Sequence, residues 1–436
     1  MTRSIKQMSC FTAILCALNA GAQDMLTVDE AVAAVLLNNF DIRLARTAAE
    51  IEAENNTLGN AGYLPVVDGT FIQEYDLNNV RQQFVSGDVQ EGTGLQNERM
   101  NFAVLADWTV FGGFAAVTEK QRLEIFEKQG EIAVRMQIEA VLMELFAAYY
   151  EAVSLRKEIS AVESAIRISS ERLRFAEEER ALGAGSGLQV LQAKVDMNAD
   201  SAALVRREFE LRRIKSVINE LMGREPDMPF ATADEIVLKP LMPFDALSQK
   251  ASAGNAELFN ARWEAKAGEL ETKAARASYY PELGLQGMYN FQTSESEAGF
   301  LVNSRLSGLT YGLTARWNLF GGFNTRREAK TAKLRNEMAQ VNLEQTELRM
   351  RGELYRVYES YIMARRLYSI EQKNTEVARQ NLDIAAEQMR LGSINALELR
   401  EAQRNSVDAE FRLIEAAFEA KMAEADLLRL SGGLTE

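Results

Sequence analysis

The sequence can be laid over itself, and this internal repeat limits what the chain can fold into more than any other feature. "ADWTVFGGFAAV" at residues 106–117 and "ARWNLFGGFNTR" at residues 315–326 share a tryptophan, a phenylalanine, a glycine pair and a second phenylalanine. Their tryptophans, Trp108 and Trp317, are 209 residues apart. A match of this kind over such a distance indicates a duplication, so we expect two copies of one structural unit.

Other segments follow the same register. The offset of 209 aligns "ALGAGSGLQVLQA" (181–193) with "RLGSINALELREA" (390–402) without a gap. Nearer the start of each half the offset is 216, which pairs Pro65 with Pro281. The first copy therefore has seven more residues between its proline and its tryptophan than the second.

A proline-rich linker at residues 224–244 joins the two copies. It holds four of the six prolines in the chain, so it can be neither the interior of a helix nor a central strand. We expect the first repeat at 23–223 and the second at 245–436.

Four segments alternate between apolar and polar residues with a period of two, which is typical of strands with one apolar face. The alternation is clear after Pro281, at 309–319 and at 102–110, and less regular at 67–71. Each run has about 10 to 12 residues, a length that suits a tilted strand crossing a bilayer. A soluble hairpin packed on a core would give the same pattern in any one strand.

We therefore expect one β-hairpin in each repeat, at 63–111 and at 279–320. Their loops are predicted at the polar, glycine-rich stretches 76–99 and 292–308, which differ in length by the seven residues noted above. Four strands cannot close a barrel, and open sheet edges are not tolerated in lipid, so several chains would have to share one barrel.

After each glycine pair the sequence becomes helical. Residues 115–183 and 324–392 are 69 residues each and contain no proline, so each run could form a helix of roughly 100 Å. Within the first run, apolar residues keep the spacing of a coiled-coil seam. Shorter helices are predicted on either side, at 27–60 and 188–223 in the first repeat and at 245–278 and 397–432 in the second. Gly183 and Gly392 provide the backbone freedom to reverse the chain between the long and short helices.

The first 22 residues have the order of a secretory signal peptide: basic residues, an apolar run, then small residues up to Ala22. Cys10 and Cys16 are the only cysteines and lie inside this segment, so the mature chain would have no thiol. No stretch approaches the roughly 18 consecutive apolar residues of a membrane helix, so entry into a membrane would use strands.

Composition excludes several classes of function. The chain has no histidine, which excludes Ser-His-Asp and Cys-His catalysis and the usual histidine-containing zinc sites. A formal net charge of −14 argues against nucleic acid as a partner. "GAGSG" (183–187) is not followed by Lys-Ser or Lys-Thr and no strand precedes it, so it is no phosphate loop. We predict no catalytic residue, metal or cofactor.

With these motifs in place, the sequence resembles the TolC family of outer-membrane efflux ducts over nearly all of the mature chain. The resemblance rests on "YLP" and "YYP" before a strand, on "WTVFGGF" and "WNLFGGF", and on the two glycine turns with "GLQVLQA" and "ALELREAQ" after them. It implies a mixed α and β fold and a homotrimer. Three chains of four transmembrane strands would form a shared barrel of twelve, and their long coiled-coil helices a periplasmic α-barrel.

The resemblance also implies function and location. The protein would lie among the lipids of the outer membrane of a Gram-negative bacterium, with a periplasmic extension and with the linker in a belt around the middle. It would catalyse nothing. An inner-membrane pump of the resistance-nodulation-division or ABC type would supply the energy, and a periplasmic adaptor would dock on the helical tips. The duct would export small molecules or secreted proteins.

Site residues follow by position in the family pattern. An acidic ring at the periplasmic aperture would fall on Glu398 and Glu401, whose spacing places both on one helix face. Without the resemblance, the interpretation of both residues as ordinary surface glutamates would be equally good. The polar latch of the family is not kept here, because its positions read Gln189, Met389 and Ile394.

Two further groups of residues are expected to matter. The tip turns that would contact the adaptor contain Leu182, Gly183, Leu391 and Gly392. The junctions between strand and helix contain Trp108, Gly112, Gly113, Trp317, Gly321 and Gly322, with Pro65 and Pro281 at the entries to the strands. The alternative to a duct is a secreted or periplasmic coiled-coil structural protein without a pore.

Overall fold

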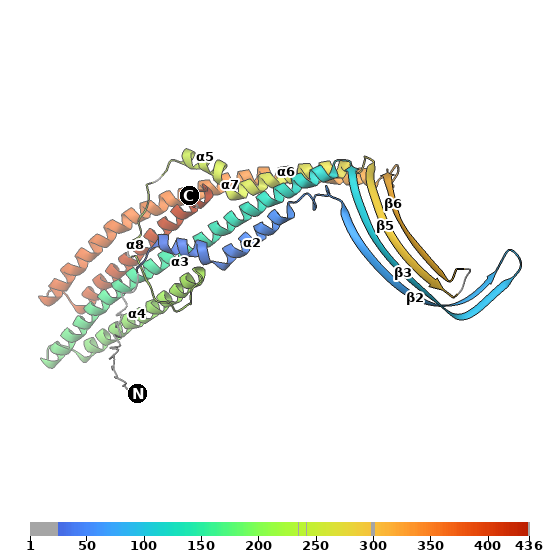
Figure 1. Cartoon of the computed structure of the whole chain (residues 1–436). Coiled ribbons are helices and arrows are strands. Elements are labelled where there is room, and N and C mark those ends of the chain that lie inside the picture. The colour runs from blue at the N-terminus through green and yellow to red at the C-terminus, as the bar shows by residue number, and fades with distance from the viewer. Residues whose placement is uncertain (1–24, 234, 241, 298–300, 435–436) are drawn as a thin grey trace, which may run out of the picture. The chain divides into compact units, whose positions relative to one another are not determined.

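A computed structural model of the chain describes residues 25–434, apart from 234, 241 and 298–300 (Figure 1). The predicted signal peptide at 1–22, with both cysteines, lies outside the described residues. The chain divides into two compact units, which we describe separately. The first contains the residues up to Asn39, 142–240 and 361–425, and the second contains 40–141, 241–360 and the residues from Asp426 on.

The second unit contains an antiparallel sheet with the strand order β2-β3-β5-β6 (Figure 1). Its strands are β2 (Val66–Gln83), β3 (Val89–Gly112), β5 (Glu282–Ser296) and β6 (Asn303–Arg316). The two repeats are joined where β3 pairs with β5, from Asn97 opposite Ser296 to Gly112 opposite Glu282. Two of the strands begin directly after a predicted entry residue: β2 follows Pro65, and β5 follows Pro281.

One face of this sheet is apolar because the alternating residues of all four strands fall into common rows. Phe102 of β3 pairs with Phe71 on one side and Phe291 on the other. Further rows contain Val104, Tyr289 and Leu309, then Val67, Ala106 and Tyr311, and then Trp108, Leu285 and Leu313. Beyond the phenylalanine row the same face becomes mostly polar. Gln73, Thr293 and Arg305 accompany Met100 in the next row, and Glu98, Glu295 and Asn303 accompany Tyr75 in the row after it. The apolar band therefore ends before the strands do.

The prediction of hairpin loops at 76–99 and 292–308 is wrong for most of these residues, which belong to the strands. β2 continues to Gln83 and β3 starts at Val89, which leaves 84–88 between them. β2 and β3 have 18 and 24 residues, against the expected 10 to 12. Polar residues can continue a ladder as well as apolar ones, because the ladder depends on backbone hydrogen bonds. The change from apolar to polar sequence marks the end of the band and not the end of the strands.

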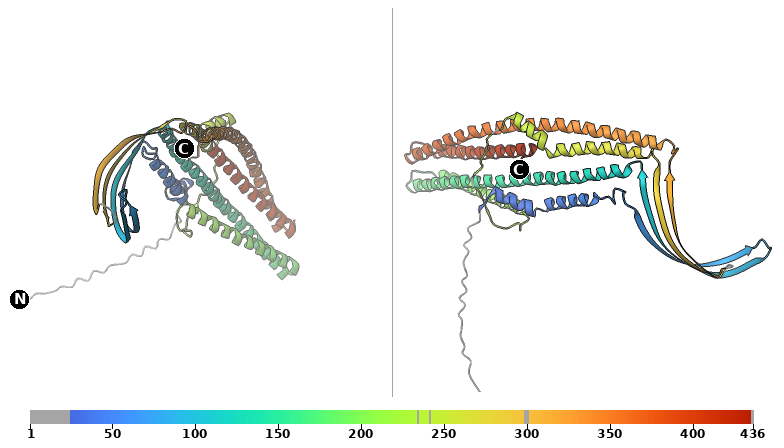
Figure 2. Two further views of the ribbon diagram at one scale, coloured as in Figure 1. Left: turned by 90° about the vertical axis from the view of Figure 1, so that its right-hand side faces the viewer. Right: turned by 45° about the horizontal axis from the view of Figure 1, so that its top comes forward.

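Each repeat has one long helix, α3 (Ala115–Ala181) and α7 (Asn324–Arg390), with 67 residues in each. A shorter helix of 35 residues follows each of them, α4 (Gly187–Leu221) and α8 (Ala396–Leu430). Figure 2 shows the long helices in two further views. Among the helices that the structure describes, none combines the length and the hydropathy that a membrane span needs.

The helices expected to run unbroken through 27–60 and 245–278 are each interrupted, so that prediction is wrong. The structure has α1 (Val28–Asn38) and α2 (Phe40–Asn55) in the first repeat, and α5 (Phe244–Gly254) and α6 (Ala256–Ala277) in the second.

The breaks fall at Asn39 and Asn255, equivalent residues of the two repeats, whose ψ values of 130° and 121° are extended and not helical. The side-chain amide of Asn39 donates to the carbonyl of Leu221 (3.0 Å), and that of Asn255 donates to the carbonyl of Leu430 (3.2 Å). Each asparagine thus satisfies a carbonyl at the end of α4 or α8, where the helix itself offers no donor.

In the first unit the linker is held by tyrosine side chains. β1 (Met25–Leu26) pairs in parallel with β4 (Ala231–Thr232), which lies within the linker. The buried hydroxyl of Tyr149 donates to the carbonyl of Leu26 (2.8 Å) and accepts from the amide of Ala233 (3.2 Å). The hydroxyl of Tyr361 donates to the carbonyl of Lys239 (3.0 Å). These bonds tie the linker to the long helices of both repeats.

Candidate functional site

The first tip turn reverses the chain between α3 and α4. Gly183 has a φ of +77°, and the amide of Ala184 donates to the carbonyl of Glu179 (2.9 Å), as at many helix ends that finish in a left-handed glycine. Ser186 then caps α4, and the side-chain oxygen of Gln189 accepts a hydrogen bond from the backbone amide of Ser186 (2.8 Å). Gln189, one of the latch-equivalent positions, therefore belongs to a capping box.

The second tip turn repeats this geometry between α7 and α8. Gly392 has a φ of +73°, and the amide of Ser393 donates to the carbonyl of Gln388 (2.9 Å). The side-chain oxygen of Asn395 accepts from the amides of Leu397 and Glu398, both at 3.0 Å. The large apolar side chains next to the turn glycines are exposed to solvent: the exposed fraction is 84% for Leu182 and 71% for Leu391.

The two glutamates of the expected acidic ring lie in the first turns of α8 and are exposed. Glu398 accepts a hydrogen bond from the side-chain amide of Asn395 (2.9 Å), so it also helps to cap the helix. Glu401 lies 3.8 Å from the guanidinium of Arg404, a loose pair on the surface. Both carboxylates remain available to solvent in one chain.

The two remaining latch-equivalent positions are apolar and pack within one repeat. Met389 and Ile394 contact a buried cluster formed by Ala385, Leu399 and Ala402, which joins α7 to α8. These positions therefore fasten a helix to its own neighbour.

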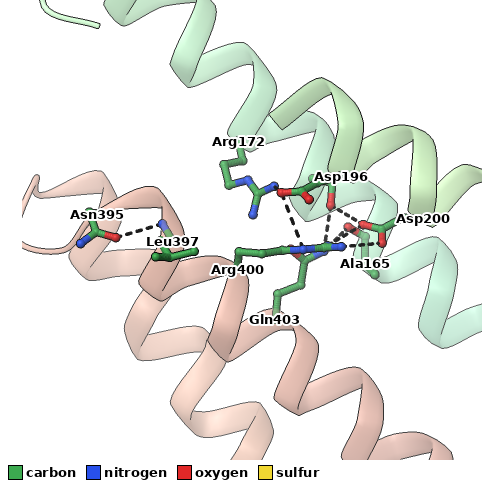
Figure 3. Close-up of polar contacts among 9 residues, drawn as sticks. Ala165, Arg172, Asp196, Asp200, Asn395, Leu397, Arg400 and Gln403 are labelled. Carbon is green, nitrogen blue, oxygen red and sulfur yellow. Dashed lines mark hydrogen bonds and ion pairs between the residues drawn. The ribbon is translucent and has the colours of Figure 1, made fainter. Parts of the chain in front are cut away.

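A polar layer that sequence reasoning missed links the two repeats within the first unit (Figure 3). Arg400 of α8 donates to both carboxylate oxygens of Asp200 of α4 (2.8 and 3.1 Å), and its Nε lies 3.8 Å from Asp196. Asp196 also pairs with Arg172 of α3, whose side chain is only 3% exposed. Burial acts to lower the pKa of Arg400, but the hydrogen bond to Asp200 and the negative charges of Asp200 and Asp196 together outweigh burial and raise that pKa.

The layer continues through two neutral side chains. Gln403 of α8 donates from Nε2 to the carbonyl of Ala165 (2.7 Å) and to the hydroxyl of Ser169 (2.9 Å). Ser169 in turn donates to Asp200 (2.5 Å), which closes the connection to Arg400. We call these six side chains the polar layer: Ser169, Arg172, Asp196, Asp200, Arg400 and Gln403.

The duplication contained a signal that could have identified this layer. At the offset of 209, Arg400 aligns with Leu191, Asp196 with Asn405 and Asp200 with Ala409. Arg400 and Asp200, which have no charged counterpart in the other copy, form the ion pair between the copies.

The strand-to-helix junctions use the same bonds in both repeats. The indole of Trp108 donates to the carbonyl of Tyr63 (2.9 Å), and that of Trp317 donates to the carbonyl of Tyr279 (3.2 Å). Both carbonyls belong to residues just before the entry prolines, so each tryptophan fastens the end of one hairpin to its beginning. Trp317 lies just beyond the end of β6, although the alternating pattern had placed it within the strand.

In each glycine pair the second glycine carries the bend. Gly113 and Gly322 both have a φ of +62°, whereas Gly112 and Gly321 do not have positive φ. The phenylalanines that follow, Phe114 and Phe323, also have positive φ, which is uncommon for a bulky residue. Each packs edge-to-face on the aromatic residue before the glycines, Phe111 or Phe320, with ring centroids 5.4 Å apart.

No cluster of three or more histidine, cysteine or carboxylate side chains suited to a metal occurs among the described residues. Carboxylates of the first unit are instead found in ion pairs, such as Asp200 with Arg400.

Comparisons with known proteins find similarity to one family model in part of the chain and to one fold over most of it. A model of the family described as outer membrane efflux protein matches residues 247–433. The chain is 19% identical over 414 residues to the outer membrane efflux protein BepC of Brucella suis biovar 1, covering 94% of this chain and 86% of BepC. It is also 19% identical over 414 residues to the cation efflux system protein CusC of Escherichia coli K12, covering 92% and 85%.

Among solved structures, the CmeC outer membrane channel of Campylobacter jejuni is similar with a TM-score of 0.78 at 16% identity, covering 93% of this chain and 86% of that one. The described fold, with long helices and a small antiparallel sheet, is thus the fold of TolC-like outer-membrane channels.

Proposed function

Because this chain is a relative of the TolC-type outer-membrane efflux proteins, we propose that three copies of it form one exit duct. The protein lies in the outer membrane of a Gram-negative bacterium and extends into the periplasm. In the proposed duct it conducts efflux and carries out no reaction of its own.

The main support for this proposal comes from the sheet. β2 and β6 are the edges of a sheet with one apolar face, and each edge has a row of backbone groups to satisfy. Lipid offers no hydrogen bonds to those groups, so the edges must pair with other strands. Pairing β6 of one copy with β2 of the next joins three sheets into a closed barrel of twelve strands, whose apolar band faces lipid.

The helices supply the part of the duct below the membrane. α3 and α7 each have 67 residues, and a helix of that length reaches about 100 Å. We propose that the helices of three copies surround a continuous periplasmic channel. The linker, tied down by Tyr149 and Tyr361, forms a belt around it.

The cargo and energy come from partners. We propose that a periplasmic adaptor contacts the tip turns at Leu182, Gly183, Leu391 and Gly392, and that an inner-membrane pump of the resistance-nodulation-division or ABC type supplies the driving force. The exposure of Leu182 and Leu391 supports such a contact, since exposed large apolar side chains often mark a partner's site. The pump passes small molecules or secreted proteins into the duct.

Two measurements on purified protein test the duct. We expect a trimer that migrates as such in detergent until heated, and we expect stepwise ion conductance when the protein is added to a planar lipid bilayer. A detergent-independent, water-soluble product without conductance would instead support a coiled-coil structural protein that has no pore.

Partners are tested in intact cells. A photo-reactive amino acid at position 182 or 391 should crosslink to the adaptor, while the same group at Val85, between β2 and β3, should not. Equal crosslinking from all three positions would contradict the proposed place of the adaptor.

A further inference from the structure

Positive charge is concentrated where α6 and α7 join the sheet. Residues 324–335, at the start of α7, contain five basic side chains and one acidic one, although the formal net charge of the chain is −14. α6 ends beside them with Lys273 and Arg276, and the two helices lie side by side where they meet β5 and β6 (Figure 1). Arg326 lies in the first turn of α7, where the helix dipole disfavours a cation. Helix stability therefore does not explain this arrangement.

Four of these side chains are exposed and have no partner of opposite charge. Within the residues that the structure describes, none of the four takes part in an ion pair or a side-chain hydrogen bond. Neighbouring cations are paired, since Arg335 lies 2.6 Å from Glu271 and Arg327 lies 3.1 Å from Glu328. We call the four unpaired residues the basic face: Lys273, Arg276, Arg326 and Lys330. The basic face can bind an anion that is not part of the chain.

The first repeat has no such face. The equivalent positions, at the offsets of 209 and 216 residues, are Val117, Gln121, Thr57 and Asn60. All four are neutral. The basic face is therefore a property of the second repeat, and the fold of the repeated unit does not require it.

Large exposed apolar side chains lie between the basic face and the apolar band of the sheet. They are Tyr279, Tyr280, Trp317, Leu319, Phe320 and Phe323. Aromatic residues in such a position are typical of the boundary between the hydrocarbon core of a bilayer and its headgroups. The basic face therefore begins where the hydrocarbon core would end.

The basic face also lies at the depth of lipid headgroups. At about 1.5 Å per residue, its four residues are within about 10 Å of the ends of α6 and α7 that meet the sheet. The headgroup region adds roughly 5–8 Å to each side of the hydrocarbon core. Long basic side chains can extend several ångströms further along a protein surface. All four cations can therefore reach the phosphate groups of lipids.

The hand of the sheet shows which side of the helices faces the membrane. The amide of Glu297, just after β5, donates to the carbonyl of Gln96 (3.1 Å), so the peptide groups of Gln96 point toward β5. Gln96 lies an even number of residues before Trp108, so its side chain is on the apolar face of the sheet. For an L-residue these directions fix the hand. Seen from the apolar side with the helices below, β5 lies to the left of β3.

The phase of the helices then turns the basic face outward. Because α6 leads into β5 and β6 leads into α7, α6 lies to the right of α7 in the same view. The two helices face each other where the hydroxyl of Thr272 donates to the carbonyl of Ala332 (3.3 Å). α7 is right-handed and runs away from the sheet, so Arg326 and Lys330, turned by about 120° and 160° from Ala332, lie on its outer side. The two residues of the basic face on α6 are turned outward from Thr272 by about 40° and 100°.

We propose that the basic face binds anionic phospholipids of the periplasmic leaflet of the outer membrane. The acyl chains lie along the apolar band of the sheet, and the phosphate group lies against the four cations of α6 and α7. Zwitterionic phospholipids offer the same acyl chains but carry a cation of their own, so the basic face selects lipids by charge. The inference rests on the proposed function, because a closed barrel in a bilayer is what brings this face to the membrane surface.

The first test identifies the lipid beside the basic face. A photo-reactive phenylalanine analogue replaces Phe323, and the trimer is placed in vesicles of equimolar phosphatidylcholine and phosphatidylglycerol. Mass spectrometry of the crosslinked protein gives the ratio of the two lipids. We expect phosphatidylglycerol to be enriched about fivefold, the factor that one Lys or Arg near an anionic membrane surface provides. Salt at about 0.5 M should reduce the enrichment by screening.

The second test removes the charges. Replacing all four residues of the basic face by glutamine should return the lipid ratio to that of the vesicle, and Arg326→Gln with Lys330→Gln should lower it part of the way. Arg351→Gln with Arg366→Gln, at two exposed arginines further along α7, is the matched control and should keep the enrichment. Single-channel conductance and heat-sensitive trimer migration show that each variant is folded, and we expect both to match wild type.

The outcomes separate the two proposals. If wild type forms no conducting trimer in a bilayer, the exit duct itself is wrong. If wild type conducts but crosslinks to lipids in the ratio of the vesicle, or if the four substitutions leave the enrichment unchanged, the duct stands and the lipid site is wrong. A change in the ion selectivity of the current without a change in the lipid ratio would place these side chains inside the channel, and it would also overturn the lipid site.

Discussion

At the scale of single residues, the two bend glycines share a backbone conformation but not their surroundings. Both have a φ of +62°. A Cβ on Gly113 would lie 2.4 Å from the carbonyl oxygen of Ala277, whereas a Cβ on Gly322 would have its nearest neighbour at 4.0 Å. Gly112 lacks positive φ and has its nearest neighbour at 3.5 Å.

Substitution by alanine should therefore follow a graded series. Positive φ costs an L-residue about 1–2 kcal/mol, so Gly322→Ala should destabilise by about that amount. Gly113→Ala should cost more because of the additional clash, and Gly112→Ala should cost least. Thermal unfolding followed by circular dichroism measures the order, and equal melting temperatures for Gly113→Ala and Gly112→Ala would refute it.

A second residue links stability to pH. Burial raises the pKa of Glu139 on α3, against the opposing effects of Arg135, whose guanidinium lies 3.0 Å away, and of Arg429. A raised pKa in the folded state means that the ionised carboxylate is penalised there. The contribution of Glu139 to stability is therefore greatest below the unfolded value of 4.5 and falls as pH rises through the folded pKa.

Glu139→Gln should remove this dependence. We expect the variant to gain stability relative to wild type as pH increases from about 4.5 upward. Melting temperatures of both proteins across this range measure the gain, and the exposed Glu144→Gln controls for the loss of one negative charge. A difference between variant and wild type that stays constant with pH would contradict the assignment.

Some residue roles could be predicted from the sequence and some could not. The turn glycines Gly183 and Gly392 were identified because helix reversal needs positive φ, which the sequence signals through glycine. Asn39 and Asn255 are equivalent at the offset of 216 residues, but their role was missed. An asparagine inside a helical pattern does not indicate which distant carbonyl it will reach.

At the scale of elements, the long helices were predicted to within a few residues, because a run without proline and with a glycine after it has clear limits. The strands were predicted too short, since the sequence signal follows the apolar band and the strands outlast it. The polar layer was missed for a related reason. Its six residues lie on three helices. The spacing of apolar residues along one helix indicates which face is buried, but it does not indicate which polar side chains of other helices meet that face.

The extended β2–β3 hairpin gives an element-scale prediction. A short epitope inserted between Ser86 and Gly87 should leave folding intact, because Gly87 has a φ of +92° and the turn is exposed. Antibody should then label intact cells. The same epitope between Gly185 and Ser186, in the first tip turn, should be labelled only after the outer membrane is permeabilised. Labelling of intact cells at both positions would contradict the proposed topology.

At the scale of the whole molecule, the acidic ring needs three copies. Glu398 and Glu401 are exposed in one chain, and a three-fold axis would bring their charges together at the aperture. Glu398→Gln with Glu401→Gln keeps the helix cap but removes the charge. We expect block of single-channel current by multivalent cations to weaken several-fold. Unchanged block would remove these residues from the ring.

The indole bonds at the junctions have an optical consequence. The chain contains three tryptophans, and two of them, Trp108 and Trp317, sit where the proposed barrel meets the helices. With Trp263→Phe, all remaining tryptophan emission would come from these two equivalent places. Lipids brominated at different depths of the acyl chain would then quench that emission by different amounts. The depth dependence of this quenching would thus measure where the two junctions lie relative to the bilayer.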